Sequence, residues 1–188
     1  MDSFTSLTGQ LLVAMPSTRG DYFSQTVTLL IEHNQEGAFG LVVNRPIETD
    51  IWEILAGNGE FNFSKDFPAK VPLLETGPVE RNRLFFLHSN DKQFSFSVPI
   101  NENVSLSTSI DLLSAIDKKE GPKDVVAGLG YAGWSPGQLE HEIKGEAWLV
   151  TPYVHDAVFK MPYADRPQIA ANVIGVNLAL IAPVVGHG

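Results

Sequence analysis

Four glycines and one proline within thirteen residues, Gly128 to Glu140, constrain the backbone of this chain more than any other segment does. The end of the segment has the pattern of a helix start. Ser135 stands at the N-cap position, Pro136 at the first helical position, and Gln138 three residues after the cap, which together make a capping box. We therefore predict a helix that begins at Pro136, capped by Ser135 and closed by a left-handed Gly145.

The same glycines also match the pattern G-x-G-x-x-G, as Gly128, Gly130 and Gly133. In a dinucleotide-binding loop of this pattern the helix opens inside the loop, and an acidic residue follows about twenty residues later. Here Ser135 begins the helix only after the last glycine, and Asp156 comes late and after another strand. A tight turn between a strand and a helix is the favoured interpretation, with a dinucleotide loop as the weaker alternative.

The length and composition fit one domain spanning residues 1–188, with 44% hydrophobic residues and a net charge of -9. The acidic balance disfavours nucleic acids and anionic membranes as partners, because both carry negative charge. The absence of cysteine excludes disulfides and thiolate metal sites. The N-terminus lacks the pattern of a secretory signal and no apolar run could span a membrane, so a cytoplasmic location is the default expectation.

Strands outnumber helices in the hydrophobic pattern and do not alternate with them regularly, which favours an α+β fold. A polar and aromatic segment without a clear period, 58–70, is predicted to be a loop. Strands are predicted at 10–14, 26–32, 39–43, 71–76, 83–88, 94–98, 104–107 and 146–151, with a hairpin turn at 34–37. Helices are predicted after Thr49, around 110–116, from Pro136 and at 166–174.

Ordered blocks along almost the whole chain resemble the YqgE/AlgH family. They include Gly9–Pro16, Glu32–Asn34, Gly37–Pro46, Gly77–Val79, Gly128–Glu140, Trp148-Leu149 and Ile174–Val176. The resemblance implies a single domain with a mixed, bifurcated or partly barrel-like β-sheet flanked by short helices, in the bacterial cytosol. It supplies no catalytic residues, because the family is largely uncharacterised. One departure is Thr76, where the family usually has a glycine, which predicts a less permissive turn before Pro78.

A predicted hairpin strand is followed directly by Asn44, Arg45 and Pro46. Pro46 biases Arg45 toward an extended conformation, so its guanidinium can project from the end of the sheet. A structural ion pair is the favoured interpretation of Arg45, and recognition of an anionic ligand is the alternative.

A second group of polar and aromatic residues accompanies the glycine-rich segment, and we predict that it lies next to the first group in space. The candidate ligand-binding or partner-binding residues are Asn44, Arg45, Tyr131, Trp134, Gln138 and Glu140. The competing hypothesis is that Arg45 pairs with Glu140 and only ties two loops together. Trp134 has a further structural explanation, because it can pack on Leu139 as a hydrophobic staple.

No metal site or cofactor is predicted. Glu32 and His33 are neighbours on a strand and so point to opposite faces. In Glu140-His141-Glu142 the spacing is unlike that of metal ligands on a helix, which stand three or four residues apart.

Two classes of function remain. The favoured one is a non-enzymatic binding or regulatory module for a protein or a small anionic ligand. The alternative is a hydrolase or a nucleotide-related enzyme that uses carboxylates, such as Glu32, Glu140 or Glu142, in a cleft near the Gly128–Gln138 loop.

Overall fold

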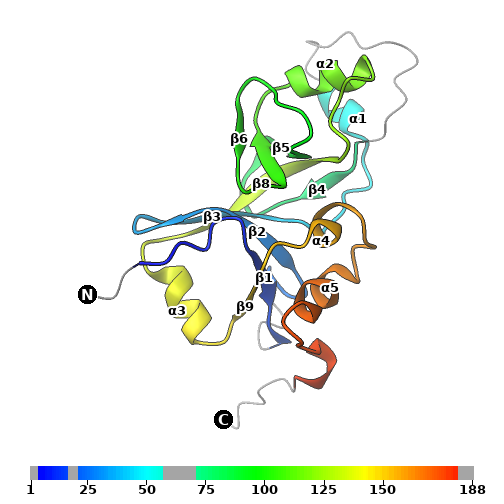
Figure 1. The fold of residues 1–188 in the computed structure, drawn as a ribbon. Helices are drawn as coiled ribbons and strands as arrows, with labels where there is room; N and C mark the ends of the chain where they lie inside the picture. The colour runs from blue at the N-terminus through cyan, green and yellow to red at the C-terminus, as the bar shows by residue number, and fades with distance from the viewer. Residues whose placement is uncertain (1–3, 17–20, 57–70, 182–188) are drawn as a thin grey trace.

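A computed structural model describes residues 4–16, 21–56 and 71–181, and it shows a strongly curled, mostly antiparallel sheet of nine strands with short helices around it (Figure 1). The strand order is β6-β7-β5-β8-β3-β2-β1-β9, and β4 pairs with β8 in parallel. This arrangement confirms the α+β class with a partly barrel-like sheet. The loop predicted at 58–70 and the helix end at Gly57 lie outside the described residues.

The strands agree with most of the predicted ones. Their bounds are β1 Leu11–Ala14, β2 Val27–Asn34, β3 Gly37–Val42, β4 Leu73–Glu75, β5 Val79–Ser89, β6 Ser97–Pro99, β7 Val104–Ser107, β8 Val125–Trp134 and β9 Trp148–Thr151. The β2–β3 hairpin is confirmed, with a turn of only two residues between Asn34 and Gly37. The largest difference is β8, which continues through the glycine-rich segment.

The helices are short and lie around the sheet. They are α1 Ile51–Ala56, α2 Asp111–Asp117, α3 Gln138–Lys144, α4 His155–Phe159, α5 Arg166–Asn172 and the 3-10 helix η2 Leu178–Leu180. Figure 1 shows α1 and α2 at one end, and α3 on the other side of β1 and β9 from α4 and α5. Of these, α4 and η2 were not predicted from the sequence.

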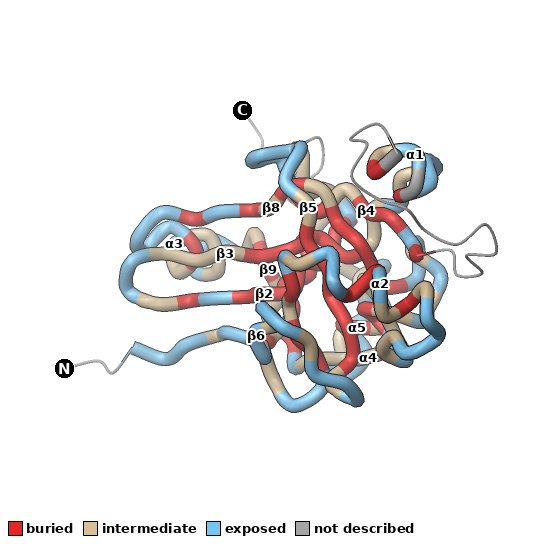
Figure 2. The backbone as a smooth tube through the Cα atoms, turned by 90° about the horizontal axis from the view of Figure 1, so that it is seen from above, coloured by how far each residue is buried: buried red, intermediate tan, exposed pale blue. Residues whose placement is uncertain are grey.

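Alternation along β1 explains how the sheet is covered on both faces. Leu11 and Val13 pack in a cluster with residues of α4 and α5, whereas Leu12 and Ala14 pack in a second cluster with Leu139 of α3. Because successive side chains of a strand point to opposite faces, four apolar residues in a row can serve two cores. A third cluster lies beneath α1 and α2. Figure 2 shows these buried positions in the middle of the molecule and exposed ones toward the hairpin tip.

The glycines of β8 allow the segment that follows β4 to approach β8 closely. The predicted strand-to-helix turn through Gly128–Gly133 is wrong. A Cβ atom on Gly128 would lie 2.4 Å from Cγ2 of Thr76. Gly130 has a φ of +78° in mid-strand, a conformation that glycine adopts readily. Thr76 itself has no positive φ, is buried, and donates a hydrogen bond from its hydroxyl to the Gly130 carbonyl. Threonine therefore suits this place, because its hydroxyl ties the segment after β4 to β8.

Both ends of α3 differ from the capping prediction. The helix begins at Gln138, after a left-handed Gly137, and the described bonds of Ser135 at the helix start are made by its backbone. Half of the capping box does form, because the Ser135 N–H donates to Oε1 of Gln138 at 3.0 Å. At the other end Gly145 has a φ of -80°, and the left-handed residue is Glu146, with a φ of +58°.

Candidate functional site

One group of the predicted site residues surrounds α3, where His33 connects three segments. Its Nε2 lies 3.0 Å from Oε1 of Glu140, and the Leu7 N–H donates to its Nδ1 at 3.0 Å. The ring therefore donates from Nε2 and accepts at Nδ1. His33 is buried and Glu32 is exposed, as strand alternation predicts. The hydrogen bond from its own backbone N–H, followed by the bond from His33, lowers the pKa of Glu140.

Glu142 forms the centre of a second polar contact on α3. Its Oε2 accepts hydrogen bonds from the indole N–H groups of Trp134 at 2.9 Å and Trp148 at 2.8 Å, and its Oε1 accepts one from Gln138 at 2.8 Å. Both indole rings are buried, and Trp134 shares a cluster with Leu139, which confirms the packing predicted for a staple. These residues satisfy one another, which is typical of a structural network.

Asn44 and Arg45 lie at the other end of β3, so the adjacent-site hypothesis is wrong, and so is the Arg45–Glu140 pair. In the register of β3 and β8, Ala38 pairs with Trp134, whereas Arg45 follows the far end of β3. Arg45 comes seven residues after Ala38 along an extended chain, on the order of 20 Å away. The sequence could not show this, because it does not reveal which end of β3 the glycine-rich strand approaches.

Arg45 lies over the ring of Tyr22, with Cζ 4.5 Å from the ring centroid, and donates a long hydrogen bond of 3.4 Å to the Ser24 carbonyl. Among the described residues, no carboxylate forms a salt bridge with it. The neighbouring Glu75 instead accepts a hydrogen bond from the Tyr22 hydroxyl at 3.1 Å and pairs with Arg81 at 3.6 Å. Burial, followed by the charge of Glu75, raises the pKa of Tyr22. The structural ion pair favoured from the sequence is thus not what the described contacts show.

Arg45 and Asn44 line a groove of about 620 Å³, which we name the Arg45 groove. It lies between the ends of the β1–β3 strands and the C-terminal helices. Its other described lining residues are Ala14, Met15, Pro16, Ser24, Gln25, Tyr163, Ala164, Pro167, Gln168, Leu178 and Ala179. Asn44 serves the fold, because its side chain accepts from the Val27 N–H and donates to the Gln25 carbonyl. Arg45 is the one charged side chain among these described lining residues.

Tyr131 belongs to neither group. Its ring packs against Phe39 at 4.9 Å and Phe85 at 6.3 Å, in the cluster beneath α4 and α5. It is therefore a packing residue in this structure.

A cluster missed from the sequence lies where β8 begins. Asp124 accepts hydrogen bonds from His155 Nε2 at 2.9 Å and from the Lys160 ammonium, and the Tyr153 hydroxyl lies 3.0 Å from Nδ1 of His155. Burial alone would raise the pKa of Asp124, but the hydrogen bonds from Lys160 and His155 lower it. Burial, and then Asp124, raises the pKa of Tyr153. The sequence did not indicate this cluster, because Asp124 lies 31 residues before His155.

The carboxylates suggested for catalysis are each engaged by a hydrogen-bond partner. Glu32 accepts a hydrogen bond from Asn34, Glu140 is bonded to His33, and Glu142 is occupied by the two indoles. Within the described ranges no group of three or more His, Asp or Glu residues could hold a metal ion. No helix in the same ranges is long and apolar enough to cross a membrane.

Comparisons with known proteins agree over the whole chain. The chain is 42% identical to a UPF0301 protein of Thioalkalivibrio sulfidiphilus over 187 residues, covering 100% of both chains. It is 43% identical to a UPF0301 protein of Pseudomonas putida over 178 residues, covering 95% of this chain and 94% of the relative.

The fold also resembles solved structures. The solution structure of the AlgH protein from Pseudomonas aeruginosa matches with a TM-score of 0.78 at 37% identity, covering 100% of this chain and 99% of that one. The crystal structure of a Corynebacterium diphtheriae protein matches with a TM-score of 0.67 at 18% identity, over 90% of this chain and 94% of that one, which shows the fold alone. Residues 11–179 match the AlgH-like family, and the chain therefore belongs to that family of uncharacterised proteins.

Proposed function

We propose that this protein is a non-enzymatic binding module, with a regulatory role, whose ligand is a small organic anion held in the Arg45 groove. The observation that carries the proposal is the charge of the groove. In a chain with a net charge of -9, the only charged side chain among its described lining residues is a cation. An arginine without a carboxylate partner can offer its planar fork to a ligand carboxylate.

The remaining walls suit the rest of such a ligand. Ala14, Pro167 and Leu178 supply apolar surface, and Ser24 and Gln25 supply polar groups at the same rim as Arg45. A mostly apolar cleft with a few convergent polar groups is the usual form of a small-molecule site. The stacking of Arg45 on Tyr22 holds the guanidinium in place before a ligand arrives.

The lining also favours binding over hydrolysis. Its described residues include no Asp, Glu or His, so the groove offers none of the usual general bases. The enzyme alternative would need the carboxylates around α3, which are engaged in the contacts described above.

Thermal-shift titration with a series of carboxylates of increasing apolar length tests the proposal. A ligand that binds only the folded protein stabilises it by about 2.7 kcal/mol at 100 times its dissociation constant. We expect a shift that grows with apolar length, is lost in Arg45→Ala and is reduced in Arg45→Lys, which keeps the charge without the fork. Arg83→Ala, which removes an exposed arginine paired with Glu80, is the matched control.

Equal shifts in Arg45→Ala and the unchanged protein would contradict the proposal. If NMR of the ligand instead shows that the protein converts it to a product, the enzyme alternative is favoured.

A further inference from the structure

A second pocket, of about 400 Å³, lies where α2, the start of β8 and α4 meet, and we name it the Lys119 pocket. Lys119 and Lys123 bring positive charge to it. Pro72, Pro122 and Phe159 are among its apolar lining residues. None of its described lining residues is shared with the Arg45 groove.

The charges of the pocket are not neutralised by its own carboxylate. Asp124 also lines it, but Asp124 already accepts from Lys160 and His155. Neither Lys119 nor Lys123 forms a salt bridge with any carboxylate in the part of the chain that the structure describes. Among the described residues, the pocket therefore has two ammonium groups without a salt bridge. They lie beside the carboxylate of Asp124 and near that of Asp91, which accepts from the Lys123 backbone N–H.

The backbone at Lys119 decides which substitutions the fold accepts there. Lys119 has a φ of +60° and stands directly after the C-cap Lys118 of α2. The Lys119 N–H bonds to the Ile116 carbonyl and the Glu120 N–H to the Ala115 carbonyl, which is the Schellman arrangement. Glycine is the usual residue at this position, because a side chain is strained there. A lysine at this place costs stability, as does Glu146 at the corresponding place after α3.

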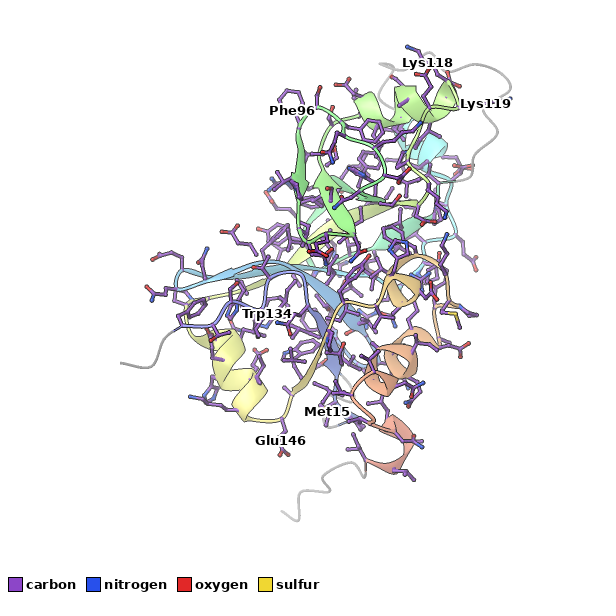
Figure 3. All side chains as sticks on the ribbon, in the orientation of Figure 1. Met15, Phe96, Lys118, Lys119, Trp134 and Glu146 are labelled. Carbon is purple, nitrogen blue, oxygen red and sulfur yellow. The ribbon has the colours of Figure 1, made fainter. Side chains whose placement is uncertain are left out.

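We propose that the Lys119 pocket binds a phosphorylated ligand with a flat apolar group. The phosphate lies between the ammonium groups of Lys119 and Lys123, and the apolar group packs on Pro72, Pro122 and Phe159. Two separate ammonium groups suit a phosphate dianion, whereas the single fork of Arg45 suits a carboxylate. Figure 3 shows Lys118 and Lys119 at the end of α2, far from Trp134 and Met15.

Isothermal titration of the full chain with phenyl phosphate tests this proposal, with inorganic phosphate and phenol as matched probes. We expect phenyl phosphate to bind more tightly than either probe, and less tightly as salt increases. Lys119→Gly and Lys119→Asn should each weaken binding at least about tenfold, or 1.4 kcal/mol, without lowering the melting temperature. Both substitutes accept the left-handed conformation, so loss of binding cannot come from loss of the fold.

Lys144→Ala, which removes an exposed lysine of α3, should bind phenyl phosphate like the unchanged protein. Arg45→Ala should also leave the affinity for phenyl phosphate unchanged. The proposal for the Lys119 pocket can therefore fail while the proposal for the Arg45 groove stands, and the reverse. Equal affinity in Lys119→Gly, or no binding at millimolar phenyl phosphate, would overturn the proposal. If inorganic phosphate binds as tightly as phenyl phosphate, the proposed packing of an apolar group on Pro72, Pro122 and Phe159 is wrong.

Discussion

At the α3 end of the β2–β3 hairpin, Glu142 accepts hydrogen bonds from two buried indoles and Glu140 from His33. At the far end of β3, the described contacts of Arg45 are a long hydrogen bond to the Ser24 carbonyl and its contact with Tyr22, and no described carboxylate forms a salt bridge with it. Both ends looked alike in the sequence, as a polar residue beside a strand and glycines. The two ends differ in whether their charged side chains have hydrogen-bond partners of opposite polarity. A polar group bonded on every side stabilises the fold, whereas a cation facing a groove without a carboxylate is available to a ligand.

The largest expected effect tests the structural end. Glu142→Ala leaves two buried indole N–H groups without an acceptor, which we expect to cost about 3 kcal/mol in the free energy of unfolding. Arg45→Ala loses mainly a cation–π contact, worth about 0.5–1 kcal/mol. Urea unfolding of both variants measures the difference, with Glu36→Ala, in the exposed hairpin turn, as a control. Similar midpoints for Glu142→Ala and Arg45→Ala would break the comparison between the two ends.

The Asp124 cluster adds a pH dependence. Asp124→Asn removes charge-assisted bonds from Lys160 and His155 and should cost roughly 2 kcal/mol at pH 7. Because the pKa of Asp124 is lowered in the folded protein, its stabilisation is present above the unfolded value near 3.8 and is lost as pH falls through the folded value. Urea midpoints from pH 7 to pH 3 should therefore converge for the two proteins below about pH 4. A constant difference across this range would show that the ionised carboxylate is not what stabilises the cluster.

A smaller effect, of opposite sign, is expected at the end of α2. Lys119→Gly should stabilise the protein by about 0.5–1 kcal/mol, because glycine relieves the left-handed backbone. Lys118→Gly is the matched control, since Lys118 has a φ of -81° and gains nothing from glycine. Thermal unfolding should rank Lys119→Gly above the unchanged protein and Lys118→Gly below it. The reverse order would remove the argument from strain.

The smallest expected effect corrects the capping hypothesis. Ser135→Ala should change stability by less than about 0.5 kcal/mol, because the described bonds of Ser135 at the helix start are made by its backbone. Gln138→Ala should cost about 1 kcal/mol, because Gln138 bonds both the Ser135 N–H and Glu142. A drop of about 1 kcal/mol in Ser135→Ala would restore Ser135 as the N-cap.

Local patterns predicted the elements well where one period dominated. The apolar run before Met15, the β2–β3 hairpin and the strand Val104–Ser107 all formed as strands. The helix with Leu113 and Ile116 on its inner face formed as α2. The opposite orientation of Glu32 and His33 followed from strand alternation alone.

The candidate sites were much harder to predict, because each depends on segments far apart in the chain. The Arg45 groove combines the ends of β1 and β3 with the region of α5 and η2, and the Lys119 pocket combines α2 with α4 and the residues before β4. Arg45 was identified from the sequence, but its neighbours were assigned wrongly. Lys119, Lys123 and Asp124 gave no local pattern that marks a pocket.

By itself, the sequence determined the α+β class and most strands, because hydrophobic period and turn residues act over a few neighbouring residues. The family followed from the resemblance of ordered blocks along the chain, not from these patterns. The tertiary structure alone decided that the glycines of β8 remain in a strand, where Thr76 and Gly77 press against them. It also decided which charges were paired, as for Glu142, and which faced a cavity, as for Arg45 and Lys119. Which side chains pair across the sheet depends on strand register and sheet curvature, and no short stretch of residues determines either of these.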